Sequence, residues 1–269
     1  MKLFTNKKKL QSEIKKINNI SFVPTMGALH KGHENLIKKS VKESEKTIVS
    51  IFLNPKQFNN KKDFYNYPKS FSNDIKILKK LKVNYLYKPS YDDIYKFKTK
   101  NKIFLDQFSK ELCGPYRKGH FKGVVDVVNR LLEIIEPKKI FLGMKDFQQL
   151  VLIEKHIKKN KINTKVIPCK TIRDNKFIAY SSRLRKINKD EMHTLIKVIR
   201  FLKTYKKNLI SKKIKFNYKK IKSILLSRGA NKVDYVKIID LKTLKKPKRN
   251  KFNLFFAFYI GKIRFIDNF

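Results

Sequence analysis

Short apolar runs alternate with segments of helical periodicity from residue 20 onwards. The runs are rich in β-branched and aromatic residues and end at turn residues, which is typical of buried strands. Five runs are predicted as strands: residues 20–24, 47–52, 83–87, 139–143 and 164–168. Four segments between them carry the spacing of amphipathic helices: residues 33–45, 69–81, 123–136 and 146–158. This alternation predicts βα units and an α/β fold with a mainly parallel sheet.

Two segments show the helical pattern most simply. In the third helix, apolar residues recur at one face, and Pro137 is expected to end the helix because the residue before a proline avoids the helical conformation. In the basic N-terminal stretch, Leu10, Ile14 and Ile17 share one face. That stretch has no apolar core followed by small residues, so it is expected to be an ordinary amphipathic helix and not a secretory signal.

The pattern changes after Arg185, where two basic helical stretches precede two strand-like runs at 233–241 and 252–260. A chain of 269 residues is long enough for two unequal domains. The sequence therefore predicts a catalytic domain over residues 1–183 and a smaller α+β domain over residues 184–269.

The charge is strongly positive, with 66 Lys and Arg against 21 Asp and Glu and a formal net charge of +45. Such a balance can indicate nucleic-acid binding. Here the lysines recur along the whole chain, Asn, Ile, Phe and Tyr are abundant, and Trp is absent, a pattern typical of an AT-rich genome. Compositional drift is the favoured interpretation over a selected polyanion site, and only weak, salt-sensitive nucleic-acid binding is expected, with no specific nucleic-acid partner.

The length of the apolar runs and the spacing of the cysteines bear on membrane spans, disulfides and zinc sites. No apolar run approaches the 18–20 residues of a membrane span, so no membrane partner is expected. Cys113 and Cys169 lie far apart without CxxC spacing, which predicts neither a disulfide framework nor a zinc site. Reduced thiols and a cytoplasmic setting are the expectation.

The loop after the first predicted strand carries the most chemistry: Pro24 to His33 reads PTMGALHKGH. His30 and His33 are three residues apart and face the same way on a helical turn. Gly27 and Gly32 allow backbone N–H groups to approach a ligand closely. A helix N-terminus with nearby imidazoles suits a triphosphate. Histidines that only cap or pack a helix start are an equally good interpretation of a bare HxxH spacing, whereas a zinc protease site requires HExxH and a P-loop signature is missing.

Further motifs occur in a fixed order along the chain. HxGH after a first strand resembles the HIGH signature of the nucleotidylyltransferase superfamily, and PTMGALHKGH resembles the pantothenate synthetase family in particular. The segments that resemble the same family are SIFLNPKQF (50–58), GHFKGV (119–124), FLGMKDFQQL (141–150), SSR (181–183) and GKIRFIDN (261–268). Together they cover essentially the whole chain, and they imply a Rossmann-like parallel-sheet N-terminal domain.

Two positions depart from the family pattern. Met144 stands where the family usually has Glu in GEKD, and Tyr180 stands where a small aliphatic residue or Met precedes Ser-Ser-Arg. The loss of the glutamate puts ATP affinity in question without removing Lys145. The C-terminal region also diverges strongly.

The resemblance implies ATP-dependent condensation of (R)-pantoate with β-alanine to give pantothenate, AMP and pyrophosphate through a pantoyl-adenylate intermediate. It also implies Mg2+ with the ATP and a homodimer. The implied catalytic residues are His30, His33, Lys145 and Arg183, with His33 the better candidate for a proton or hydrogen-bond donor. Solvated charges and a helix cap are the alternative interpretation of these side chains.

The implied ATP-binding residues are Met26, Gly27, Ala28, Leu29, His30, Lys31, Gly32, His33, Gly143, Met144, Lys145, Asp146, Ile172, Tyr180, Ser181, Ser182 and Arg183. Gln57 and Gln149 are the implied pantoate ligands, because an amide can both donate to and accept from hydroxyl and carboxylate groups. A variant capping box that starts at Asp146 is the alternative for Gln149. Near-site candidates are Asn54, Arg117 and His120.

No protein metal ligand set is expected, because phosphate oxygens would hold most of the Mg2+ coordination, with Asp74 as a helper at most. Two other functions stay open at this point. One is a nucleotidylyltransferase that keeps its adenylate as product, against which both glutamines and the PTMG opening argue. The other is a basic RNA-binding module on the same fold, which predicts a steep salt dependence of binding.

Overall fold

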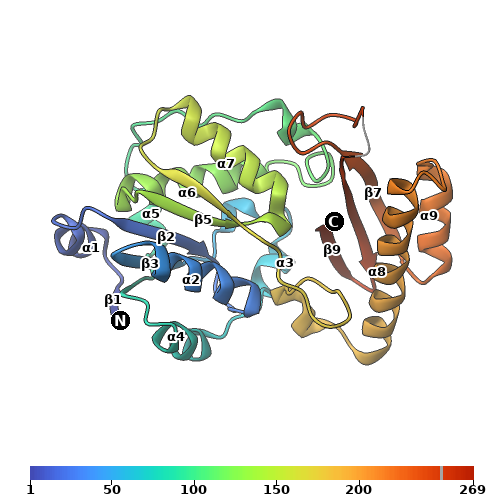
Figure 1. Cartoon of the computed structure of the whole chain (residues 1–269). Helices are drawn as coiled ribbons and strands as arrows, with labels where there is room; N and C mark the ends of the chain where they lie inside the picture. Colours follow the sequence, from blue (N-terminus) through green and yellow to red (C-terminus); the bar gives the residue numbers. More distant parts are fainter. Residues whose placement is uncertain (249–250) are drawn as a thin grey trace. The chain divides into compact units, whose positions relative to one another are not determined.

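The chain folds into two compact units in the computed structural model, which describes residues 1–248 and 251–269. The first unit comprises Met1–Ser109 and Arg117–Ile172, and the second comprises Lys110–Tyr116 and Arg173–Phe269. Figure 1 shows both units along the chain, coloured by sequence. Within the described part of the chain, no helix is both long and apolar enough to cross a membrane.

A six-stranded sheet with the order β1-β4-β3-β2-β5-β6 forms the centre of the first unit. Every strand pairing in it is parallel. The strands are β1 (Lys2–Phe4), β2 (Ile20–Thr25), β3 (Lys46–Ile51), β4 (Tyr85–Tyr87), β5 (Lys139–Gly143) and β6 (Lys165–Cys169). The α/β class predicted from the alternation of apolar runs is confirmed, and each of the five predicted strands forms within two residues of its expected bounds.

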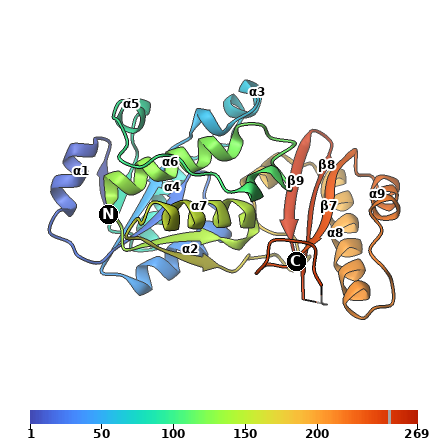
Figure 2. The ribbon, with the colours of Figure 1, turned by 90° about the horizontal axis from the view of Figure 1, so that it is seen from above.

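Helices cover both faces of this sheet. They are α1 (Lys7–Ile14), α2 (Lys31–Glu43), α3 (Lys61–Tyr65), α4 (Phe71–Lys80), α5 (Tyr91–Tyr95), α6 (His120–Ile135) and α7 (Phe147–Lys159). Val23, Val49 and Phe141 point from alternate strand positions into one core with Ile37 of α2 and Leu78 of α4. Figures 1 and 2 show α7 on the opposite face from α2.

Helix ends follow local sequence signals. The helix α6 ends at Ile135, and Glu136 takes a left-handed conformation directly before Pro137, as predicted. The helix α1 ends earlier than the apolar spacing suggested: Leu10 and Ile14 are buried in it, whereas Ile17 lies beyond its end.

The second unit contains a three-stranded antiparallel sheet with the order β7-β8-β9 and two helices. Its elements are α8 (Lys189–Ile210), α9 (Tyr218–Ser227), β7 (Lys232–Ile239), β8 (Asn253–Ile260) and β9 (Ile263–Asn268). Apolar residues of α8 and α9, such as Leu202 and Leu225, pack with Phe256 and Phe258 of the central strand in one core. The α+β character predicted for this part of the chain is confirmed, and β9 is an additional strand.

The change of unit occurs between Ile172 and Arg173, earlier than the Arg183 boundary predicted from composition. Arg173 forms an antiparallel bridge with Ala179 and an ion pair with Asp267 of β9. Ile178 belongs to the core of the second unit. The second unit also takes in Lys110–Tyr116, where Cys113 Sγ lies 3.2 Å from the Tyr235 hydroxyl. Boundaries drawn from composition alone miss such contacts, because the partners are distant in sequence.

Candidate active site

Three loops meet at the carboxyl edge of the first unit's sheet. They follow β2, β3 and β5, which are neighbours in the order β3-β2-β5. The chain leaves β2 toward β3 on one side, whereas β5 lies on the other side, so the strand order reverses at β2. In open parallel sheets, ligands bind in the crevice beyond the carboxyl ends at such a point. The site residues predicted in the first unit come mainly from these three loops.

The loop after β2 has a backbone that few residues adopt. Gly27 has φ of 79° and Ala28 has φ of 50°, both in the left-handed region. His30 is the N-cap of α2, and its Nδ1 accepts a hydrogen bond of 3.1 Å from the Gly32 N–H. The rings of His30 and His33 lie 3.9 Å apart between centroids, at 31° to each other. The capping interpretation is therefore right for one ring nitrogen of His30. Capping by that nitrogen is compatible with a ligand role for the pair of imidazoles.

The Asp74 carboxylate of α4 holds the loop after β2 through hydrogen bonds to its backbone. Its two carboxylate oxygens accept hydrogen bonds from the N–H groups of Ala28 (2.9 Å) and Leu29 (2.8 Å), and the side chain is almost fully buried. A Cβ at Gly27 would lie 3.1 Å from Asp74 Oδ2, which is why glycine suits the position. Asp74 was expected at most to help with Mg2+. The structure shows it as the anchor of the loop.

The loop after β5 carries Lys145 in a short 3₁₀ turn, Met144–Asp146. The Lys145 side chain is mostly buried, and its Nζ lies 3.7 Å from Asp146 Oδ1. Asp146 is the N-cap residue of α7 but makes no side-chain capping bond, so the capping box that would explain Gln149 is not formed. Gln149 is half-buried, whereas its neighbour Gln148 is buried and donates to the Phe108 carbonyl at 2.7 Å.

Gln57 lies in the 3₁₀ turn after β3, Pro55–Gln57, and is buried. Its Nε2 lies 2.9 Å from Met26 Sδ in the loop after β2, and its Oε1 accepts from Asn54 Nδ2 at 3.2 Å. The Arg117 guanidinium donates to His120 Nε2 at 2.8 Å, which leaves the proton on Nδ1 to donate to the Gln57 carbonyl at 2.7 Å. The near-site candidates Asn54, Arg117 and His120 are therefore brought together around Gln57.

Gly123 of α6 makes this arrangement possible. A Cβ at Gly123 would lie 2.3 Å from the Lys56 carbonyl oxygen, so only glycine lets the helix lie directly against the 3₁₀ turn. The motif GHFKGV is visible in the sequence, but the close approach that explains its last glycine is visible only in the fold.

The other predicted residues divide between the units. Lys31 is exposed at the start of α2, Gly143 ends β5, and Ile172 is the last residue of the first unit. Tyr180, Ser181, Ser182 and Arg183 lie in the second unit, so their place relative to the three loops stays a prediction. Within that unit, Ser181 Oγ accepts from the Arg183 N–H at 3.3 Å and caps a 3₁₀ turn, Ser182–Lys186.

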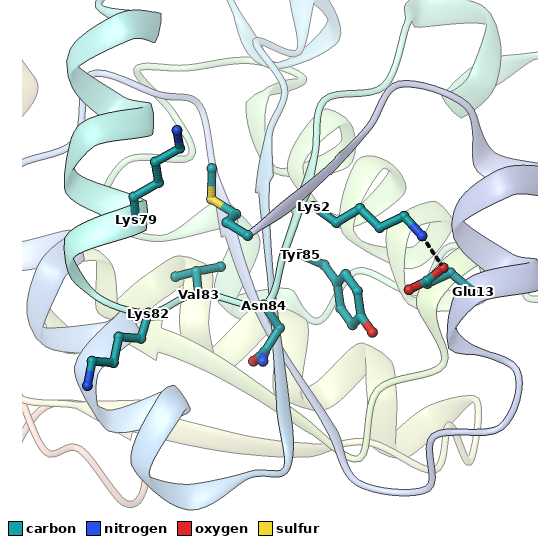
Figure 3. Close-up of a pocket in the computed structure, with 8 residues that line it drawn as sticks. Lys2, Glu13, Lys79, Lys82, Val83, Asn84 and Tyr85 are labelled. Atoms are coloured by element: carbon teal, nitrogen blue, oxygen red, sulfur yellow. Dashed lines mark hydrogen bonds and ion pairs between the residues drawn. The ribbon is translucent and has the colours of Figure 1, made fainter.

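A separate hollow lies at the amino ends of β1 and β4 (Figure 3). Lys79 and Lys82 line it from the end of α4, and Lys2 Nζ pairs with Glu13 at 2.6 Å on its rim. The hollow is at the opposite end of the strands from the three loops. None of the predicted site residues lines it.

The site thus combines a helix N-terminus, two adjacent imidazoles, a lysine and two side-chain amides at the point where the strand order reverses. Such features suit an α/β protein whose ligands are a phosphate-bearing molecule and a polar organic one. A family model described as Pantoate-beta-alanine ligase matches residues 2–269, so the chain belongs to that family. Membership assigns to the chain the family's ATP-dependent formation of pantothenate.

Individual relatives agree with this assignment. The chain is 38% identical to a pantothenate synthetase of Flavobacterium psychrophilum over 255 residues, which cover 93% of this chain and 90% of the relative. It is 37% identical to a Francisella tularensis pantoate-beta-alanine ligase whose structure is described as complexed with beta-gamma ATP and beta-alanine. The TM-score is 0.86, with coverage of 100% and 97%. A Thermus thermophilus pantothenate synthetase shares the fold, with a TM-score of 0.88 at 23% identity and coverage of 100% and 99%.

Proposed function

We propose that the chain forms pantothenate in two steps at the carboxyl edge of the first unit's sheet. A carboxylate oxygen of (R)-pantoate attacks the α-phosphorus of ATP, and pyrophosphate leaves as pantoyl adenylate forms. The amine nitrogen of β-alanine then attacks the acyl carbon, and AMP leaves as the amide bond forms and the amine loses a proton. The observation that carries this proposal is the loop after β2, which Asp74 holds through two hydrogen bonds and in which the rings of His30 and His33 lie side by side.

In the first step, negative charge builds on the α-phosphate and on the departing pyrophosphate. Fixed donors and cations in a site shielded from water lower the energy of that state. His30 and His33 lie at the start of α2, and the backbone N–H groups of a helix N-terminus also favour an anion. We assign the phosphate contacts to these two imidazoles and to Lys145, with His33 as the donor to the leaving group.

Gln57 and Gln149 are assigned to pantoate. Both side chains come from loops at the same sheet edge, after β3 and at the first turn of α7. An uncharged amide can hold hydroxyl and carboxylate oxygens without adding charge beside the reacting phosphate.

Some of the residues assigned to ATP belong to the second unit. By family resemblance we assign Arg183 as a further cation toward the phosphates, aided by the hydroxyls of Ser181 and Ser182, and Ile172 and Tyr180 to the adenosine side. By the same resemblance we propose residues 1–183 as the catalytic region and residues 184–269 as the smaller domain.

Mg2+ would enter with ATP. The two carboxylate oxygens of Asp74 already accept hydrogen bonds from two backbone N–H groups. Among the described residues, no cluster of three or more His, Cys, Asp or Glu side chains could hold a metal ion. A Mg2+ ion coordinated mainly by phosphate oxygens and water is compatible with this arrangement. Bound there, Mg2+ would neutralise phosphate charge.

The proposed partners are pantoate, β-alanine and ATP, and a second copy of the chain in a homodimer. The complex of the Francisella tularensis relative with beta-gamma ATP and beta-alanine supports the small-molecule partners. The place of such a biosynthetic enzyme is the cytoplasm, and no specific nucleic acid is part of the proposal.

Pyrophosphate release from ATP tests the assignment. The wild-type chain should release pyrophosphate with ATP and pantoate, and AMP should accumulate steadily only when β-alanine is added. His33→Ala and Lys145→Ala should each lower release on the order of 100-fold or more, as the loss of one transition-state donor does. His193→Ala, at an exposed position of α8, is the control that should keep full activity. Undiminished release in both site variants would overturn the assignment.

A further inference from the structure

The amide of Asn54 has one orientation, fixed by two backbone groups. Its Oδ1 accepts from the Lys56 N–H at 3.2 Å, and its Nδ2 donates to the Gly123 carbonyl at 3.0 Å. A backbone N–H can only donate and a carbonyl can only accept, so exchanging the oxygen and nitrogen of Asn54 would break both bonds. The side chain is almost fully buried, which makes that exchange costly.

The orientation of Asn54 determines that of Gln57. The same Nδ2 group donates to Gln57 Oε1 at 3.2 Å, so the oxygen of the Gln57 amide faces Asn54. The nitrogen Nε2 therefore faces the other way, and it lies 2.9 Å from Met26 Sδ in the loop after β2. Gln57 presents N–H donors toward that loop, and a ligand that meets it there must supply an acceptor atom.

Tyr95, the last residue of α5, closes the network from the other side. Its hydroxyl donates to Asn54 Oδ1 at 2.8 Å. Lys56 Nζ lies 3.8 Å from the centroid of the Tyr95 ring, and the guanidinium carbon of Arg130 lies 5.0 Å from it. Tyr91 adds a ring at 4.7 Å. The helix α5 contacts α6, which helps to hold Tyr95 in place.

Burial, with a further contribution from the Asp126 carboxylate, raises the pKa of the Tyr95 hydroxyl above its ordinary value. The hydroxyl therefore keeps its proton throughout the neutral range. It remains a donor to Asn54 under all conditions in which the enzyme would work.

We propose that Tyr95 is a positioning residue for the acid substrate, because its hydroxyl holds Asn54, and through it Gln57, with the Gln57 N–H groups directed at an acceptor oxygen of pantoate. This inference rests on the proposed role of Gln57 as a pantoate ligand. Neither the motifs nor the spacing of the sequence points to Tyr95, which lies 41 residues after Asn54.

Tyr95→Phe is the direct test, because it removes the hydroxyl and keeps the ring between its neighbours. The KM for pantoate should rise about threefold to tenfold, the effect of one lost hydrogen bond, while the KM for ATP stays within about twofold. Tyr91→Phe is the matched control: the same change on the same helix at a largely exposed residue, and it should alter neither constant. An unchanged KM for pantoate in Tyr95→Phe would overturn the proposal.

A double-mutant cycle with Gln57→Ala separates the inference from the function on which it rests. If Gln57→Ala leaves the KM for pantoate unchanged, the substrate role of Gln57 itself is wrong. If Gln57→Ala raises it and Tyr95→Phe does not, only the role of Tyr95 is wrong. In the Gln57→Ala background, Tyr95→Phe should add nothing. If Tyr95→Phe raises the KM for pantoate further in the Gln57→Ala background, and raises the KM for ATP by the same factor, the effect is a general structural one. That result would also overturn the proposal.

Discussion

Asp74 shows how one buried carboxylate can shape the loop after β2, to which we assign phosphate contacts. The left-handed conformations of Gly27 and Ala28 turn the N–H groups of Ala28 and Leu29 toward Asp74. A buried carboxylate that accepts two backbone N–H bonds is stabilised in its charged form and fixes both donors. The positions of His30 and His33 therefore depend on a residue of α4.

Replacing Asp74 with Asn should loosen this loop. The Asn side chain offers one acceptor oxygen, and its NH2 group would face a second backbone N–H, so one buried donor loses its partner. The KM for ATP should rise on the order of tenfold, since one such bond is worth about 1.5–3 kcal/mol. Steady-state kinetics with varied ATP measures it. Asp190→Asn is the control, because Asp190 is also an acidic residue in the first turn of a helix but is exposed. Equal KM values for ATP in Asp74→Asn and the wild type would contradict the anchoring role.

At the scale of single residues, the sequence predicted what depends on short spacing. The three-residue interval of His30 and His33 was enough to predict that the imidazoles face the same way, and their ring centroids lie 3.9 Å apart. The contacts of Asp74 with Ala28 and of Tyr95 with Asn54 join residues 46 and 41 positions apart. Such pairs are set by how helices pack on the sheet, and no local pattern records them.

The long elements were predictable because their apolar residues repeat often enough to define a period. The helix α6 has 16 residues and a continuous buried face. The short elements were not predicted: β1 has three residues and α5 has five, too few for a periodic pattern. A local signal for α5 does exist, because Ser90 and Asp93 form a reciprocal capping box at its start.

One buried histidine ties α6 and α7 to the preceding loop. His156 of α7 is almost fully buried, and its Nδ1 accepts from the Phe104 N–H at 3.2 Å. Its Nε2 is therefore the protonated nitrogen and donates to Asn129 Oδ1 at 3.0 Å. The bond from Phe104 requires the neutral ring, because a proton on Nδ1 would face the Phe104 N–H. Burial lowers the pKa of His156 below its ordinary value, although the nearby Glu133 carboxylate opposes this.

Stability should therefore fall as the pH drops below the pKa of an unfolded histidine, about 6.5. Above that pH the ring is neutral in both states and its contribution is fully present. Below it the unfolded chain binds a proton that the folded chain does not, and stability is lost until the pH reaches the lower folded pKa. Urea unfolding between pH 7.5 and 5.5 should show a decline of up to about 1.4 kcal/mol per pH unit from this group.

The His156→Gln variant should be less stable at pH 7.5 but should lose less free energy of unfolding over this pH range. His193→Gln, at an exposed position of α8, should keep the wild-type decline. If His156→Gln and the wild type have parallel pH profiles, another group is responsible.

For the whole molecule, the division into units follows contacts that composition does not reveal. Lys110–Tyr116 lies between two stretches of the first unit in sequence, yet it belongs to the second. The Arg264 guanidinium contacts Cys113 Sγ at 3.5 Å and also pairs with Asp234. The Tyr116 hydroxyl donates to the Asp234 carbonyl. The change in sequence pattern after Arg185 predicted that a smaller α+β region exists. Which residues belong to that region depends on side-chain contacts between residues more than a hundred positions apart.

The net charge of +45 acts on the molecule as a whole. Like charges on one folded chain repel each other, and salt screens them over a Debye length of about 10 Å at 0.1 M and 3 Å at 1 M. If the lysines accumulated by compositional drift, nothing compensates this repulsion at low ionic strength. The Tm should then rise between about 0.02 and 0.5 M KCl. A gain of about 1 kcal/mol corresponds to roughly 2–4 °C for a protein of this size.

A variant with Lys219, Lys220 and Lys222 replaced by Gln tests this directly, because these exposed residues of α9 lie outside the proposed site. Its Tm at low salt should exceed that of the wild type, its salt-dependent rise should be smaller, and its kcat/KM should be unchanged. The drift interpretation also requires that RNA binding disappear at physiological salt in both proteins, since binding by phosphate contacts alone weakens steeply with ionic strength. A lower Tm for the variant at low salt, or RNA binding that survives 0.15 M salt in the wild type and is lost in the variant, would instead show that these lysines have a selected role.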